Sequence, residues 1–188
     1  MKFSAPCLVV ADTFDELYRD LMTRLTADPD CESSPRGMRV REVLGAGLTL
    51  TDPRARVLAS PARAANYGFA AGELCWYLRG ACDLESILYY NRRMRDFSDD
   101  GETLAGAYGP KWFNHGLGSS SQWDLVADEL ARDPDSRRAV LATYDHSDLR
   151  RAAAGTRDVP CTTTLQFLLR ASCADGSLRA SCAAGSLR

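Results

Sequence analysis

The feature that most constrains this chain is the alternation of two hydrophobic patterns along it. Apolar residues recur at helical spacing in the segments 13–27, 67–79, 84–91 and 122–132. Shorter apolar runs typical of strands occupy the segments 39–50, 138–144 and 162–170. Helices interspersed with strands predict a mixed α/β (α+β) domain with one main sheet.

The ends of two helices are marked by residues with a clear physical role. Thr13 stands where an N-cap is expected and Glu16 follows three residues later, which is the pattern of a capping box. The helix over 122–132 meets Asp133-Pro134, where a proline cannot continue a helix. Turn-forming residues predict loops at 28–37 and 96–111. The pattern of 146–158 does not decide between helix and loop.

Length and charge restrict the class of protein. A chain of 188 residues with 45% hydrophobic side chains is large enough for one globular domain over residues 1–188. The net charge of −2, from 23 basic and 25 acidic residues, gives no overall field for nucleic-acid binding. The sequence has neither a signal peptide nor a run of about 18 apolar residues. We therefore expect a cytoplasmic protein without nucleic-acid or membrane partners.

The seven cysteines do not form a metal-binding or disulfide pattern. They contain no CxxC pair, and the two histidines, His115 and His146, lie far apart in the chain. A zinc site is therefore not expected. A chain of this size without a secretion signal is not expected to be a disulfide scaffold. Most of the cysteines are interpreted as small buried residues.

The C-terminal segment, 171–188, is atypical because the chain repeats itself there. LRASCADGS at 169–177 is followed by LRASCAAGS at 178–186. Two copies are too few for a solenoid. The first copy is interpreted as a hairpin whose turn contains Asp175-Gly176, and the second as a duplication, an artefact or a truncated end.

Cys161 is the candidate nucleophile. It lies between Pro160, which fixes the preceding turn, and the polar start of a predicted strand at Thr162. Reactivity requires that the thiolate form be stabilised by a nearby positive charge or hydrogen-bond donors. Taken alone, a single cysteine is more often a packing residue.

Three arginines are candidates for binding a phosphate group. Arg137 and Arg138 lie between a predicted helix and a predicted strand, and Arg36 lies in the loop before the first strand region. Guanidinium groups bind phosphate through two parallel hydrogen bonds. The alternative for each is a solvated surface residue.

Glu73 and Tyr108 are candidates for proton transfer. Glu73 lies in an otherwise apolar helix, and a carboxyl group in apolar surroundings can exchange protons near neutral pH. Tyr108 is flanked by Ala107 and Gly109, with Gly106 nearby, so the backbone can approach a ligand closely. The alternatives are a solvent-facing carboxylate and an ordinary turn.

The segments that contain these residues resemble the thymidylate synthase and pyrimidine-nucleotide hydroxymethylase family. The resemblance covers roughly residues 36–170, and its matching stretches occur in the family's order: GELCWYLRG at 72–80, GAYGPKW at 106–112, DPDSRR at 133–138 and PCTTTLQFLLR at 160–170. The cysteine stretch is closest to deoxycytidylate hydroxymethylase and to the CMP 5-hydroxymethylases of nucleoside-antibiotic pathways. The resemblance implies a thymidylate-synthase-like fold.

The resemblance also implies catalytic roles for three residues. Cys161 attacks C6 of the pyrimidine, Glu73 transfers protons through a water network, and Tyr108 assists proton removal from C5. The chemistry is reasonable because C5 of a pyrimidine is a poor nucleophile, and addition of a thiolate at C6 makes it enolate-like.

Binding roles follow from the same resemblance. Arg137 and Arg138 bind the 5′-phosphate of a nucleotide held by the partner subunit of a homodimer, and Arg36 matches the phosphate-loop arginine approximately. The implied activity is hydroxymethylation of CMP or dCMP at C5, with 5,10-methylenetetrahydrofolate as donor. The alternatives are a thymidylate synthase that methylates dUMP, and a non-catalytic nucleotide-binding or dimerisation module.

The sequence departs from the family in two places. Family members have the residues that read the base and bind folate after the cysteine strand, where this chain has the repeated segment 171–188. We therefore expect a C-terminally incomplete version of the fold. The family's tryptophan-rich segment, which stacks on folate, is replaced here by YYNRRMRDFSDDG at 89–101.

Overall fold

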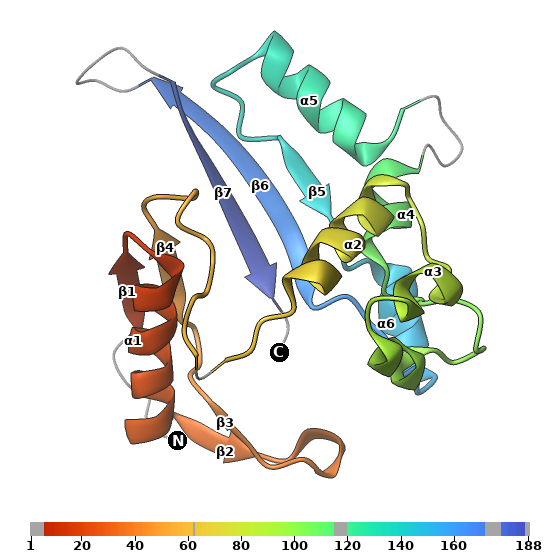
Figure 1. Ribbon diagram of the computed structural model, residues 1–188. Helices are drawn as coiled ribbons and strands as arrows, with labels where there is room; N and C mark the ends of the chain where they lie inside the picture. Colours follow the sequence, from red (N-terminus) through yellow and green to blue (C-terminus); the bar gives the residue numbers. More distant parts are fainter. Residues whose placement is uncertain (1–5, 62, 115–119, 172–177, 187–188) are drawn as a thin grey trace. The chain divides into compact units, whose positions relative to one another are not determined.

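The computed structural model describes residues 6–61, 63–114, 120–171 and 178–186 (Figure 1). The backbone alone is described for Arg36, residue 171 and residues 178–186. The chain divides into two compact units, Met1–Asn66 and Tyr67–Arg188, each of which is described by itself. None of the described helices has the length and apolar character needed to cross a membrane.

The first unit contains one long helix and two pairs of short strands. Its elements are β1 (Leu8–Ala11), α1 (Phe14–Ala27), β2 (Cys31–Ser33), the 3-10 helix η1 (Pro35–Gly37), β3 (Val40–Glu42) and β4 (Gly47–Leu50). Strand β1 pairs in parallel with β4, and β2 pairs antiparallel with β3. The predicted capping box is confirmed, because the Thr13 side chain accepts the Glu16 N–H and the Glu16 carboxylate accepts the Thr13 N–H.

The second unit combines helices with one three-stranded antiparallel sheet. Its helices are α2 (Tyr67–Leu78), α3 (Leu84–Leu88), the 3-10 helix η2 (Arg92–Phe97), α4 (Tyr108–Phe113), α5 (Gln122–Arg132) and α6 (His146–Ala153). Its strands are β5 (Val140–Ala142), β6 (Thr162–Ala171) and β7 (Leu178–Ser186), in the order β5-β6-β7. Figure 1 shows α5 beside β5 in this unit, in agreement with the contacts between them.

The hydrophobic core of the second unit lies between α2, α3 and the loop before α4. Trp76 of α2 packs with Leu84 and Ile87 of α3 and with Leu104 and Ala107 of the loop. The indole N–H of Trp76 donates to the backbone oxygen of Asp83 at 3.1 Å, which satisfies the polar group of this buried ring. The core therefore fixes α2 against the segment that leads into α4.

The repeated C-terminal segment contributes to two paired strands. Strand β7 pairs antiparallel with β6 over its whole length, and the register places Arg170 opposite Arg179 and Ala171 opposite Leu178. The predicted turn at Asp175-Gly176 lies outside the described residues. The second copy of the repeat is thus the sheet partner of the cysteine strand.

The α/β class predicted from the sequence is confirmed, but several details differ. The described strands form three small sheets rather than one main sheet. The strand region at 39–50 is interrupted by a turn at Leu44-Gly45, so it becomes β3 and β4. Gly45 has a φ of 64° in this turn, a conformation that glycine adopts readily. The loops expected at 28–37 and 96–111 also contain β2 and the start of α4. The single domain over 1–188 stays a prediction.

Helix α6 forms in a short, largely polar segment whose pattern does not decide between helix and loop. Asp145 caps it, because its carboxylate accepts the N–H groups of Ser147, at 2.6 Å, and Asp148, at 3.3 Å. Such a cap satisfies N–H groups that have no partner within the helix. The Asp148 carboxylate in turn accepts the Asp145 N–H at 2.8 Å. This reciprocal cap outweighs the weak hydrophobic pattern.

Replacement of Ile87 by alanine should destabilise the second unit by about 3 kcal/mol, because the side chain is completely buried and its removal leaves a cavity. Urea unfolding followed by tryptophan fluorescence measures this loss. Leu74→Ala is the control, because Leu74 is 56% exposed. This control should change the free energy of unfolding by about 0.5 kcal/mol or less. Equal effects of the two variants would contradict the described core.

Candidate functional site

Cys161 lines a cavity of about 210 Å³ within the second unit, which we call the cysteine cavity. Its polar lining comprises Glu73, Tyr77, Tyr108 and Asp158 in addition to Cys161. The three residues predicted for catalysis are therefore brought together from α2, from the start of α4 and from the segment before β6. Their catalytic roles stay predictions.

Two hydrogen bonds hold the chain on either side of Cys161. Before it, the Gly106 N–H donates to Oδ2 of Asp158 at 2.7 Å. After it, the Thr162 N–H donates to the Tyr108 hydroxyl oxygen at 3.2 Å. Pro160, immediately before the cysteine, is fully buried. The cysteine segment is thus fixed to the segment 106–108 at two points, which gives the half-buried cysteine a defined position.

Gly106 is required for this arrangement because there is no room for a side chain. A Cβ atom at this position would lie 2.9 Å from Oδ1 of Asp158 and 2.9 Å from the carbonyl carbon of Val159. Since the second contact is with backbone, it could not be relieved by a side-chain rotation. The glycine therefore permits the close approach of the two segments.

Helix α2 contributes a carboxylate and a phenol that act as a pair. Glu73 and Tyr77 are four residues apart and so lie on the same face of the helix. Burial, together with the negative charge of Glu73 and a hydrogen bond to it, raises the pKa of Tyr77 well above its ordinary value. Tyr77 therefore stays neutral beside Glu73. Its ring stacks on that of Tyr108, with centroids 5.2 Å apart.

Asp158 is a second carboxyl group on the lining of the cavity. Burial raises its pKa, and the negative charges of Asp99 and Asp148 act in the same direction, whereas the Gly106 N–H and the positive charge of Arg151 oppose them. The net direction of the pKa is upward. A carboxyl group of this kind takes up a proton more readily than an ordinary aspartate.

Sequence reasoning missed Tyr77 and Asp158, although both had a detectable signal. Tyr77 lies one helical turn after Glu73. Asp158 lies three residues before Cys161, in a segment fixed by Pro160. In each case a titratable side chain accompanies a predicted catalytic residue at a spacing that places both near one site.

A buried ion pair fixes helix α4, which begins with Tyr108. Lys111 Nζ lies 2.6 Å from Oδ2 of Asp148, whose side chain is completely buried in α6. Arg151 also contacts the Asp148 carboxylate. Trp112 adds a link to the sheet, because its indole N–H donates to the hydroxyl of Thr143 at 2.9 Å. These contacts determine where the Tyr108 ring lies.

Replacement of Lys111 by methionine should destabilise the protein by about 3 kcal/mol, because it removes one partner of a buried pair and leaves the Asp148 charge undercompensated. Chemical denaturation at pH 7 measures the effect. Arg132→Met provides the control, since the Arg132 side chain is 71% exposed in its ion pair with Glu129. An exposed pair of this kind contributes little to stability. A loss below about 1 kcal/mol for Lys111→Met would refute the anchoring role assigned to the buried pair.

The apolar lining of the cysteine cavity includes two residues of the atypical segment 89–101. Met94 and Phe97 both lie in η2 and line the cavity together with Phe69, Trp76 and Leu104. A flat, partly apolar ring system can pack against such a surface. The segment that replaces the family's tryptophan-rich stretch thus still presents an aromatic ring and a thioether to the site.

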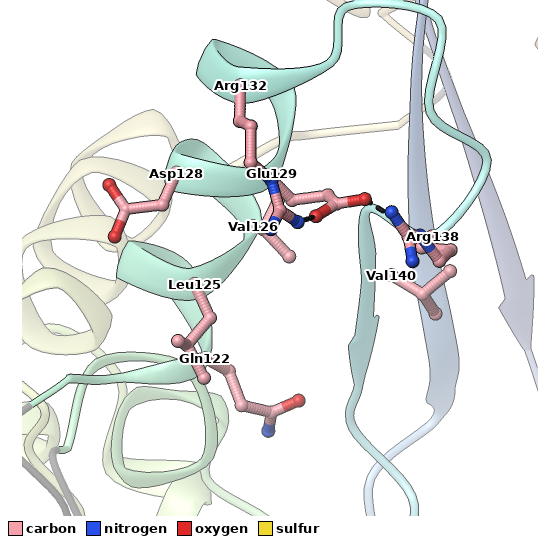
Figure 2. Close-up of a pocket in the computed structure, with 8 residues that line it drawn as sticks. All are labelled: Gln122, Leu125, Val126, Asp128, Glu129, Arg132, Arg138 and Val140. Atoms are coloured by element: carbon pink, nitrogen blue, oxygen red, sulfur yellow. Dashed lines mark hydrogen bonds and ion pairs between the residues drawn. The ribbon is translucent and has the colours of Figure 1, made fainter.

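The arginines predicted to bind phosphate lie outside the cysteine cavity. Arg138 lines a different pocket, of about 510 Å³, between α5 and β5, where its Nε lies 2.9 Å from Oε1 of Glu129 (Figure 2). Figure 2 shows Glu129 between Arg132 and Arg138, and ion pairs join it to both. Arg137 is exposed, and its carbonyl oxygen accepts a hydrogen bond from the Gln166 side chain at 2.9 Å.

Arg36 belongs to the first unit, where it lies in η1. Its side chain is outside what the structure describes, so its phosphate-binding role stays a prediction. Among the residues that are described, no group of three or more histidine, cysteine, aspartate or glutamate side chains is arranged to hold a metal ion.

Comparison with known proteins identifies the family. The family model described as thymidylate synthase matches residues 16–186, which is most of the chain. This protein therefore belongs to the thymidylate synthase family, and its mixed helices and small sheets are a form of that fold.

The similar curated proteins carry a more specific name. A deoxyuridylate hydroxymethyltransferase of Bacillus phage SP01 is 29% identical over 163 residues, which cover 82% of this chain and 42% of the relative. The protein of that name from Pseudomonas phage M6 is 38% identical over 127 residues, covering 67% of this chain and 34% of the relative. That of Delftia phage PhiW-14 is 33% identical over 121 residues, covering 60% of this chain and 32% of the relative. The chain thus spans less than half the length of these relatives.

Proposed function

We propose that this protein attaches a hydroxymethyl group to C5 of a pyrimidine nucleoside monophosphate, with Cys161 as the nucleophile. The observation that carries the proposal is the convergence of Cys161, Glu73 and Tyr108 on one cavity from three separate parts of the chain. A packing cysteine would need no such neighbours. Membership of the thymidylate synthase family and the names of three relatives support the same reaction class.

The substrate we place first is dUMP, because all three relatives are named for deoxyuridylate. The cytidine nucleotide expected from the residues after Cys161 stays a prediction, and CMP and dCMP are the competing substrates in any test. The cytoplasmic location and the place in nucleoside-antibiotic synthesis suggested by the sequence also stay predictions.

In the proposed mechanism, the Cys161 thiolate adds to C6 of the ring and converts C5 into a nucleophilic, enolate-like carbon. The Tyr108 hydroxyl oxygen already accepts the Thr162 N–H, so its own hydrogen can be directed to a ligand or a water molecule. In this proposal the Tyr108 hydroxyl assists removal of the proton from C5, the role inferred from the sequence.

Glu73 is the proton carrier in this proposal. Its carboxylate lies on the cavity lining one helical turn before Tyr77, whose pKa burial raises well above its ordinary value. A proton can then move between Glu73 and the ring through water, which is the role inferred for Glu73 from the sequence.

The donor we propose is 5,10-methylenetetrahydrofolate. The apolar lining formed by Phe69, Trp76, Met94 and Phe97 offers a surface of the kind on which a flat ring such as the pterin packs. The group supplies a one-carbon unit when bound. The contribution of these four side chains is to bind and orient the ring and to exclude water from the reacting carbon.

The arginines enter the proposal through a homodimer. Arg137 and Arg138 are exposed and lie outside the cavity that contains Cys161 of the same chain. Their location is compatible with the role inferred from the sequence, in which they bind the 5′-phosphate of the nucleotide held by the partner. Two adjacent guanidinium groups can give a phosphate several charge-assisted hydrogen bonds.

Replacement of Cys161 by serine should abolish exchange of the C5 hydrogen of dUMP, CMP or dCMP with D₂O, because a hydroxyl group at this position is too weak a nucleophile to add to C6. Loss of the C5–H signal in proton NMR measures the exchange, and it requires no folate. Cys75→Ser is the control, since Cys75 is exposed on the same helix that carries Glu73 and should leave the exchange rate unchanged.

The same assay distinguishes the alternatives. With the donor present, a 5-hydroxymethyl product supports the proposed activity, whereas a 5-methyl product identifies a synthase. Nucleotide binding without any C5 exchange identifies a non-catalytic binding or dimerisation module. Full exchange by Cys161→Ser would overturn the assignment of the nucleophile.

Mixing two inactive variants tests the shared site. Cys161→Ser lacks the nucleophile, and the double variant Arg137→Met/Arg138→Met lacks the proposed phosphate ligands. If each site combines Cys161 of one subunit with the arginines of its partner, subunit exchange restores up to about a quarter of the parent activity, because half of the dimers contain one intact site. If the arginines serve their own subunit, mixing restores none, and if they serve no site, the double variant is already active before mixing.

A further inference from the structure

The second carboxyl group of the cysteine cavity has no role in the mechanism above. Asp158 lines the cavity with Cys161 and Glu73. Its Oδ2 is held by the Gly106 N–H at 2.7 Å. No donor in the described part of the chain forms a hydrogen bond with its Oδ1. One oxygen is thus fixed by the backbone, and the other remains available to a ligand or a water molecule.

The two carboxyl groups of the cavity differ in their surroundings. The Glu73 carboxylate lies beside Tyr77, one turn further along the same helix. Asp158 receives a backbone N–H instead, and its position three residues before Cys161 ties it to the nucleophile's own segment. Hydroxymethylation has two separate proton transfers, one at C5 of the ring and one from the water that becomes the new hydroxyl group. A cavity with two differently held carboxyl groups can serve both.

We propose that Asp158 is the base that takes a proton from the water molecule that adds to the one-carbon unit on C5. The inference rests on the proposed function, because it assigns a residue to the step that separates a hydroxymethylase from a synthase. The upward direction of the Asp158 pKa is compatible with this role, since a more basic carboxylate is a better proton acceptor.

The one-carbon unit stands on C5 as an exocyclic methylene while the Cys161 sulfur is still bonded to C6. The water oxygen bonds to the methylene carbon, one O–H bond breaks, and its proton passes to Asp158, while the π electrons of the methylene move into the ring as an enolate. The enolate then expels the Cys161 thiolate, which breaks the S–C6 bond and restores the C5–C6 double bond. Asp158 returns its proton to solvent, and no oxidant or reductant is needed.

Asp158→Asn is the variant that tests the role. It keeps the size of the side chain and an oxygen that can accept the Gly106 N–H, but it removes the basic oxygen. We expect exchange of the C5 hydrogen in dUMP alone to stay within about threefold of the parent, and formation of the 5-hydroxymethyl product to fall at least about a hundredfold. Glu102→Gln is the matched control, because Glu102 is an exposed acidic residue outside the cavity, and it should alter neither rate.

Each other outcome overturns the proposal in a distinct way. Unchanged product formation in Asp158→Asn shows that Asp158 does not handle the proton of water. An equal fall in exchange and product shows that it only positions Cys161. If the parent protein exchanges the C5 hydrogen but forms no hydroxymethyl product, water does not add to the one-carbon unit, and Asp158 has no such step to serve. A parent protein without exchange for any of the three nucleotides sinks the proposed function, and the role of Asp158 with it.

Two measurements extend the test beyond product formation by the intact site. In protein labelled with ¹³C at aspartate carboxyl groups, the signal that disappears in Asp158→Asn should shift when saturating dUMP is added, and an unchanged signal would contradict contact with the ligand site.

The second measurement is product formation by Asp158→Ala with added formate, since a small carboxylate can occupy the vacated space. Formate should raise its product formation at least about tenfold, and no rise in a folded variant would contradict the base role.

Discussion

The position of the Cys161 sulfur depends on the attachment of its segment to the segment 106–108. The Asp158 carboxylate receives the Gly106 N–H on one side of the cysteine, and the Tyr108 hydroxyl receives the Thr162 N–H on the other. Because a Cβ at position 106 would collide with backbone, the two segments can be this close only when glycine is present. The buried ion pair of Lys111 and Asp148 supports the same arrangement, because it joins α4 to α6. These polar contacts fix the position of Cys161 before any substrate is bound.

Local patterns are sufficient to predict much of the architecture. The capping box at Thr13 and Glu16 and the periodicity of 122–132 correspond to α1 and α5, because these helices depend on local capping and on one apolar face. The pairing of β7, from the second copy of the repeat at 169–186, with β6 was not predicted from the sequence. Helix α6 could not be predicted with the same certainty, because it depends on the Asp145 cap and on the contact of Asp148 with Lys111, which is distant in sequence.

The candidate site could be predicted only in part, for a similar reason. Cys161, Glu73 and Tyr108 were identified through matching stretches in a fixed order, and the fold brings all three to one cavity. Asp158 was missed because its significance lies in contacts with Gly106 and in its burial, which are properties of the folded chain. The proposed relation of Arg137 and Arg138 to the site depends on two subunits rather than on the folding of one.

The most specific inference from sequence, a preference for cytidine, rests on the residues that follow Cys161. Those residues form the start of β6, where they belong to the sheet and directly follow the cysteine of the cavity. The relatives named for deoxyuridylate support a different first choice of base. The two views share the same nucleophile and the same attack at C6, and they differ in the group at C4 of the ring and, for CMP, in the sugar.

A crystal structure of the protein with bound dUMP tests the central claim most directly. We expect the pyrimidine to lie in the cysteine cavity, with C6 facing the Cys161 sulfur. Glu73 should lie on the path of the proton transfer at the ring, and Asp158 on the path of the proton from water. A nucleotide bound elsewhere, with the sulfur enclosed by apolar side chains and no ring atom near it, would contradict the account.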